Sequence, residues 1–170
     1  QISNRLALRG NFLLNRNQAD FDADAYQDAA GYTLSKTAYF GGLGVCLDIR
    51  KGGLNINLNQ NNVINSWDYN GAVINNKSQI SHLDAVFNYG LVSFVNLTSG
   101  LSYKYSATKQ INAYAPPLDV NNAITSVFTS FFFKTNGGFR SEIGGRYNTH
   151  TQYGSNFTYT INPSYLLANR

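Results

Sequence analysis

Apolar and polar residues alternate in the stretch Val95-Asn96-Leu97-Thr98-Ser99-Gly100-Leu101-Ser102-Tyr103-Lys104-Tyr105. Every second side chain of a β-strand points to the same face, so one face of this stretch is apolar and the other is polar. A helix would need apolar residues three and four positions apart, and this spacing is scarce along the chain. The stretch therefore predicts a strand with two chemically different faces.

The same alternation recurs along the whole chain and predicts eight strands. They lie near Ser3–Asn15, Thr33–Ile49, Leu54–Asp68, Gln79–Asn88, Ser93–Thr108, Ala123–Lys134, Phe139–His150 and Asn156–Leu166. The strands of a soluble sandwich recur every 8–12 residues, a much shorter spacing than the one found here. Most of these runs alternate for about ten residues, the length that a tilted strand needs to cross a bilayer. The expected fold class is all-β, an antiparallel transmembrane β-barrel.

The connections between these strands alternate between short and long, as is typical of outer-membrane barrels. The short turns are expected at Arg50–Gly53, Asn88–Gly90 and Thr135–Gly138. The longer polar connections are expected at Arg16–Tyr32, Tyr69–Ser78 and Lys109–Asn122.

Two aromatic groups at strand ends have separate interpretations. Phe131–Phe133 places aromatic rings on both faces, so we expect a bulge or a strand end there. Trp67 and Tyr69 lie at one strand end and are interpreted as anchors at the membrane interface.

Composition excludes several classes of protein. Charged residues make up 13% of the chain, against about 25% in ordinary globular domains. The 12 Tyr and 11 Phe argue against disorder, and the single cysteine, Cys46, excludes a disulfide scaffold. No apolar run is long enough for a transmembrane helix. The basic residues are spread singly, so we expect no nucleic-acid partner.

Alternation alone does not say which face points inward. A soluble ligand-binding barrel would turn its apolar face inward, whereas a membrane barrel turns it toward lipid. The charged residues on the polar face sit among Asn, Thr and Ser, which favours a polar lumen. The residues expected to face the lumen or a plug are Arg5, Arg9, Arg140, Glu142 and Arg146.

The last third of the chain resembles a known family over Gly138–Leu167. A strand that ends in Gly144-Gly145-Arg146-Tyr147 is followed by a short loop containing His150, Tyr153 and Gly154. A strand with Phe157-Thr158-Tyr159 then runs into Asn162-Pro163-Ser164-Tyr165. This string resembles the mid-barrel region of TonB-dependent outer-membrane receptors, and it most resembles the cobalamin-receptor-like branch.

The resemblance implies a barrel of about 22 strands around a plug, located in the Gram-negative outer membrane. It implies import of a scarce nutrient, with a cobalamin-like corrinoid first and a siderophore or haem next. The implied partners are outer-membrane lipid, the TonB complex acting through the plug, and a surface lipoprotein. The sequence departs from the family because it has no plug and no closing strand. We therefore expect residues 1–170 to be a partial barrel domain.

Two other interpretations stay open. Eight strands at this spacing would also make a self-contained eight-stranded outer-membrane barrel with a structural, anchoring role. The second alternative is the soluble ligand-binding barrel. The flanking sequence would separate the fragment from the complete small barrel.

Two clusters were considered as chemical sites. Asp20, Asp22 and Asp24 alternate in an expected external loop and could bind calcium, although a solvated acidic loop is favoured because the EF-hand spacing fails. Ser81, His82 and Asp84 lie along one strand and cannot form a catalytic triad in the required order. We expect no enzyme activity and no cofactor other than this calcium.

Overall fold

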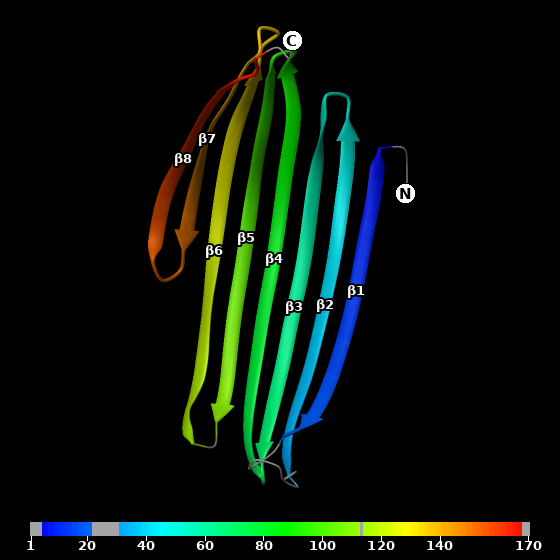
Figure 1. Ribbon diagram of the computed structural model, residues 1–170, viewed down its shortest axis with the longest axis vertical. Coiled ribbons are helices and arrows are strands. Elements are labelled where there is room, and N and C mark those ends of the chain that lie inside the picture. The colour runs from blue at the N-terminus through cyan, green and yellow to red at the C-terminus, as the bar shows by residue number, and fades with distance from the viewer. Residues whose placement is uncertain (1–4, 22–30, 113, 168–170) are drawn as a thin grey trace.

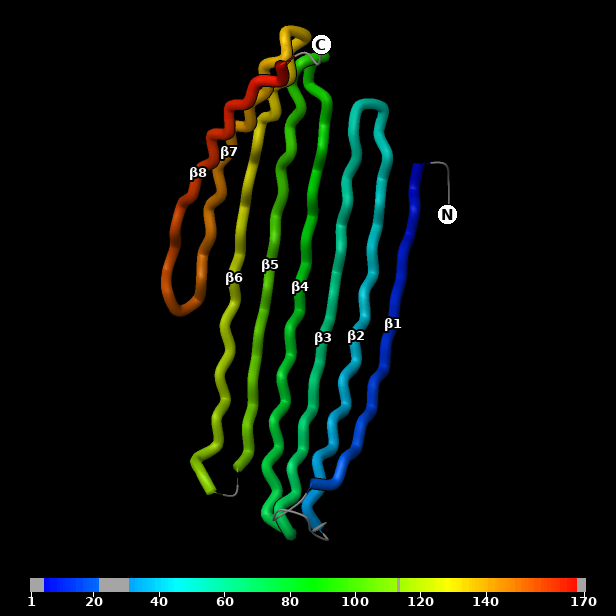
Figure 2. The backbone as a smooth tube through the Cα atoms, in the orientation of Figure 1, coloured from blue at the N-terminus to red at the C-terminus, as the bar shows by residue number. Residues whose placement is uncertain are grey.

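The computed structural model describes residues 5–21, 31–112 and 114–167, which form one antiparallel sheet of eight strands. Each strand pairs with the next one along the chain, as Figures 1 and 2 show. The strands are β1 (Leu6–Asp20), β2 (Tyr32–Ile49), β3 (Gly52–Tyr69), β4 (Ala72–Val92), β5 (Val95–Asn112), β6 (Ala115–Lys134), β7 (Phe139–His150) and β8 (Gly154–Tyr165). The expectation of an all-β antiparallel fold is confirmed.

The register places most of the large apolar residues on one face, here called the apolar face, although a few, such as Leu13, Phe40, Phe128 and Phe132, lie on the other face. One cross-strand row on the apolar face runs Leu8, Val45, Ile56, Ala85, Leu101, Val127, Tyr147 and Phe157. The side chains on this face are not covered by other elements: Phe12 is 72% exposed and Phe157 is 65% exposed. An apolar surface of this size needs an apolar environment outside the sheet.

The height of the apolar face matches a bilayer. The longest run is in β2, where this face has no polar side chain from Tyr39 to Ile49; on β3 the apolar run is Leu54 to Leu58, and Gln60 and Asn62 follow it opposite Gly41 and Tyr39. At about 3.3 Å per residue the β2 run covers about 33 Å along the strand. A tilt of about 40° reduces the height to about 25 Å, the height of the apolar band of outer-membrane barrels. We call this part of the sheet the apolar band.

Beyond the apolar band the strands continue with polar residues on both faces. The expected long connections at Tyr69–Ser78 and Lys109–Asn122 are therefore wrong, because most of these residues extend hairpins. The β3–β4 turn consists of Asn70 and Gly71, with φ of 54° and 93°. Alternation marks a strand where its two faces meet different environments, and this signal is lost where both faces meet water.

The structure also differs from the local predictions made for Asn88–Gly90 and for Phe131–Phe133. Asn88–Gly90 lies within β4, and the register shifts between Gly90 and Val92 instead of turning. Phe131–Phe133 pairs regularly with β5 and β7. The expected bulge is therefore absent there, whereas the strand end is confirmed because β6 ends at Lys134.

Trp67 does not anchor the protein at the lipid interface. Its cross-strand partners are Leu34 and Ile74, which place it on the polar face and far beyond the apolar band. A membrane anchor would have to lie on the apolar face at the band edge. Tyr69 lies on the polar face as well, opposite Tyr32 and Ala72.

The boundary of the described sheet has two open edges and a short hairpin at one of them. Within the described residues β1 pairs with β2 alone and β8 pairs with β7 alone, so the sheet has two edges. β7 and β8 are shorter than the other strands, and β6 pairs with β7 from Ile124 to Lys134 (Figure 1).

The described part of the chain contains no helix with the length and hydropathy to span a membrane.

The β3–β4 turn gives a first test. A Cβ at Gly71 would meet no atom within 4 Å, but φ of +93° disfavours any L-residue. We expect Gly71→Ala to lower the free energy of unfolding by about 1–2 kcal/mol. Gly41→Ala is the matched control, because Gly41 has equal space and is not among the positive-φ glycines. Denaturant titration of both variants checks this, and equal stability would contradict the turn geometry.

Candidate functional site on the polar face

The face opposite the apolar band carries most of the charge of the sheet and is here called the polar face. It brings together the residues expected at the lumen: the register puts Arg9 on the same face as Arg140, Glu142 and Arg146. Arg5 continues the alternation of β1 one residue earlier, and its carbonyl accepts a hydrogen bond from the Asp48 amide at 2.8 Å. Whether this face lines a lumen or contacts a plug stays a prediction.

Cations exceed carboxylates on this face. By register and alternation, the described cations on it are Arg5, Arg9, Lys36, Lys104, Lys134, Arg140 and Arg146. The described carboxylates on it are Asp48, Asp84 and Glu142. Seven cations against three carboxylates leave an excess of four positive charges, so whatever occupies this side of the sheet meets a positive potential.

His82 and two polar partners lie in the middle of the polar face. His82 Nε2 lies 3.1 Å from Asp84 Oδ2 and 3.2 Å from Ser102 Oγ. Both partners therefore use the same ring nitrogen, whereas a catalytic triad uses both nitrogens of the imidazole. Ser81 lies on the opposite face, where its hydroxyl donates to Gln60 Oε1. The geometry gives a polar cross-strand contact and no hydrolase triad.

A second network joins β6 to β7 and contains the most buried polar side chain. Ser126 is 2% exposed and its hydroxyl donates to Asn148 Oδ1 at 2.7 Å. Arg146 Nε donates to the same oxygen at 2.9 Å, and the Arg146 guanidinium lies 5.7 Å from the centre of the Phe128 ring. These contacts hold Arg146 in place on the polar face.

A hollow of about 570 Å³ is lined by Ser126, Arg146 and Asn148 of this network and reaches the β7–β8 turn. His150 lines it, and His150 Nδ1 accepts hydrogen bonds from the Gln152 amide at 3.0 Å and the Tyr153 amide at 3.3 Å. The Tyr153 ring lies 4.6 Å from the imidazole, centre to centre. His150 therefore stabilises the turn.

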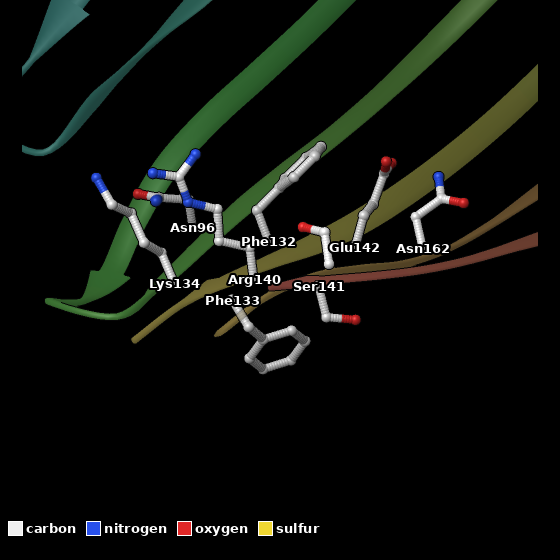
Figure 3. Close-up of a pocket in the computed structure, with 9 residues that line it drawn as sticks. Asn96, Phe132, Phe133, Lys134, Arg140, Ser141, Glu142 and Asn162 are labelled. Carbon is white, nitrogen blue, oxygen red and sulfur yellow. The ribbon is translucent and has the colours of Figure 1, made fainter. Parts of the chain in front are cut away.

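A smaller hollow of about 320 Å³ lies at the end of the sheet where β6 turns into β7. Lys134 and Arg140 are direct cross-strand partners and project to the same side as Glu142 (Figure 3). Phe133 and Ser141 point the opposite way in the same view, which shows the alternation of the two faces directly.

An aromatic cluster at the far end of the polar face was not predicted. Phe21, Tyr32 and Tyr69 make three edge-to-face contacts with ring centres 5.4–6.1 Å apart. The sequence signal was weak because Phe21 lies after the end of β1 and its partners belong to β2 and β3. The register that brings them together could not be deduced from composition.

The calcium hypothesis stays a prediction. Asp20 ends β1, whereas Asp22 and Asp24 lie outside the described residues. The described part of the chain contains no group of three His, Cys, Asp or Glu side chains that could hold a metal ion. Cys46 is a free thiol opposite Ala7 and Asn55 on the polar face.

The Ser126 network gives a second test. We expect Ser126→Ala to lower the free energy of unfolding by about 1 kcal/mol, because it removes a buried hydrogen bond to Asn148. Ser130→Ala is the control on the same strand and face, since Ser130 makes no side-chain hydrogen bond with the described residues. Denaturant titration compares the two, and a loss as large for Ser130→Ala would contradict this assignment.

Comparisons with known proteins bear on the fold. No protein-family profile matches the chain, and no curated protein matches it. Two solved structures are similar over 99% of this chain at 13% identity. One is a mutant of the ferric enterobactin receptor PfeA from Pseudomonas aeruginosa, with a TM-score of 0.72. The other is the siderophore receptor PirA from Acinetobacter baumannii, with a TM-score of 0.73.

The chain covers 30% of the length of each receptor. At this identity the likeness establishes the fold alone. Neither receptor is a cobalamin receptor, so the comparisons add nothing to the cobalamin-like resemblance of Gly138–Leu167. The chain has the antiparallel fold of a segment of an outer-membrane β-barrel receptor.

Proposed function

We propose that this chain forms part of the barrel wall of a TonB-dependent outer-membrane transporter. The observation that carries the proposal is the division of the sheet into an apolar face, about 25 Å high in β2, and a positively charged polar face. The likeness to two siderophore receptors over almost the full chain supports the same conclusion. The role is transport through a membrane and not catalysis.

The two edges of the sheet support a barrel larger than eight strands. A closed eight-stranded barrel needs β1 to pair with β8, and in the described residues each of these strands has one partner. A free strand edge within the bilayer would leave backbone amides and carbonyls without hydrogen bonds. Further strands beside β1 and β8 would satisfy these groups, as in a large transporter barrel.

The soluble barrel is less compatible with the shape of the apolar surface. In a soluble ligand-binding barrel the apolar face would line the inside along the whole strand. Here it ends at the band edge, and strands such as β3 and β4 continue with polar residues on both faces. A band of limited height between polar extensions fits a membrane with water beyond it.

The nutrient we propose is an iron complex of the siderophore class, with cobalamin and haem as the competing substrates. Both similar structures are receptors for iron carriers by their descriptions. The excess of cations on the polar face favours an anionic ligand over a neutral one. Transport would be energised by the TonB complex, acting on a plug.

Membrane insertion is tested by a charge on each face of β8. Ile161 lies on the apolar face and is 62% exposed, while the adjacent Thr160 lies on the polar face. We expect Ile161→Arg to destabilise the folded protein in lipid vesicles by about 2–4 kcal/mol. Thr160→Arg should cost much less, because its side chain stays in water. The heat-modifiable gel mobility of folded barrels measures this, and folding without lipid or detergent would refute the membrane assignment.

Transport is tested with the protein in its full natural length. Cells that produce it should take up a radiolabelled ferric siderophore faster than cells without it. This uptake should disappear in a host that lacks TonB, because the energy comes from that complex. Labelled cobalamin and haem are tested in parallel, and selective uptake of either would replace the siderophore. Uptake of every solute without TonB would identify a passive pore instead.

A further inference from the structure

The apolar face carries no charged side chain throughout the apolar band and its polar margin in the described strands. The first charges all lie in one cross-strand row: Arg16, Lys77, Lys109 and Asp119, with Thr37 and Ile64 between Arg16 and Lys77. We call these four charged residues the basic row. Three cations and one carboxylate in a single cross-strand row form a pattern that alternation alone does not require.

The height of Lys109 in the basic row matches the headgroup layer of a bilayer. Tyr105 lies near the band edge on the same face of β5, and Lys109 follows it four residues later. This separation is about 13 Å along the strand and about 10 Å along the membrane normal at a tilt of about 40°. Tyrosine prefers the headgroup level, and long lysine side chains can bend back toward it.

The charges within the basic row are not balanced by the described residues. Lys77 and Lys109 are direct cross-strand partners, an arrangement in which like charges repel. Lys109 Nζ lies 2.8 Å from Asp119 Oδ2, and this hydrogen bond and the negative charge of Asp119 raise the pKa of Lys109 above its ordinary value. Neither Lys77 nor Arg16 forms an ion pair with a described residue. Two positive charges therefore remain available for an external anion.

Charge further out on the same face favours a lipid over a soluble acidic partner. Asp20 and Asp68 lie on this face four residues beyond the basic row, each opposite Thr33. An acidic protein approaching from solution would meet these carboxylates first. A lipid phosphate reaches the basic row from the membrane side and avoids them.

We propose that Arg16, Lys77 and Lys109 form a site for the phosphate groups of anionic lipids in the leaflet at this end of the barrel. The site rests on the proposed membrane insertion and adds a partner to the outer surface of the wall. Arg16 is separated from Lys77 by three inter-strand steps of about 4.8 Å, so the row can contact more than one phosphate.

The test uses the full-length protein in phosphatidylcholine vesicles that contain a small fraction of spin-labelled lipid. Electron spin resonance measures the fraction of labelled lipid immobilised by the protein. Spin-labelled phosphatidic acid should be enriched several-fold over spin-labelled phosphatidylcholine. Lys77→Gln and Lys109→Gln should each reduce this preference about five-fold at low salt. Asp119→Asn should increase it, because it releases Lys109.

Lys36→Gln is the matched control. Lys36 is adjacent in sequence to Thr37, which lies in the same cross-strand row as Arg16 and Lys77, but the Lys36 side chain lies on the polar face. Its substitution should therefore leave the preference for phosphatidic acid unchanged. Inorganic phosphate added at the same concentration as the labelled lipid should not displace spin-labelled phosphatidic acid from the protein. Complete displacement would show that the ligand is a free anion and would overturn the lipid site.

Gel mobility on the same samples separates this proposal from the proposed function. A protein that inserts and shows no preference for phosphatidic acid overturns the lipid site alone. An equal effect of Lys36→Gln overturns it too, because the preference would then follow net charge. A protein that does not insert overturns both proposals.

Discussion

Backbone hydrogen bonding between neighbouring strands determines which side chains share a face and which strands need a partner. A bilayer offers no water to unpaired amides and carbonyls, so each strand within it needs a partner on both sides. The chain meets this demand with a continuous antiparallel register from β1 to β8, interrupted at Gly90/Val92 and Gln110/Asn112. Because side chains alternate, one register fixes the face of every residue. A shift of a single residue would move Arg9 or Arg146 into lipid.

The same register creates the polar face from residues that are far apart in the sequence. Arg9 and Asn148 belong to one cross-strand row although they lie on β1 and β7. None of these side chains is buried in the manner of a globular core, with the exception of small residues such as Ser126. The energetics of the segment therefore depend on what lies on each side of the sheet, lipid on one and a polar interior on the other.

The number of strands and the identity of the apolar face could be predicted from the sequence, because a period of two is a local signal. The hairpin extensions could not, since the residues between Tyr69 and Ser78 show no regular alternation, with Ile74 on the polar face and Val73 on the other, and read as a loop. Trp67 was misplaced for a related reason: its aromatic character suggested an interface, whereas its register places it on the polar face. The Ser126–Asn148 and His82–Ser102 contacts depend on which residues become partners, and this information is not local.

The short β7–β8 hairpin provides an independent measure of where the membrane ends. Before Ile124, the edge of β6 that faces away from β5 has no strand partner among the described residues, and such an edge is tolerated in water but not in lipid. Side chains of the β7–β8 turn bind the first backbone groups of this edge. Thr151 Oγ1 accepts a hydrogen bond from the Ala123 amide at 3.1 Å, and Gln152 Nε2 donates one to the Asn121 carbonyl at 3.3 Å. Ile124 lies one residue from Ala123, which is level with Tyr105 at the edge of the apolar band. The end of the β6–β7 hydrogen bonds and the change in side-chain polarity therefore place the boundary between lipid and water at the same position on β6.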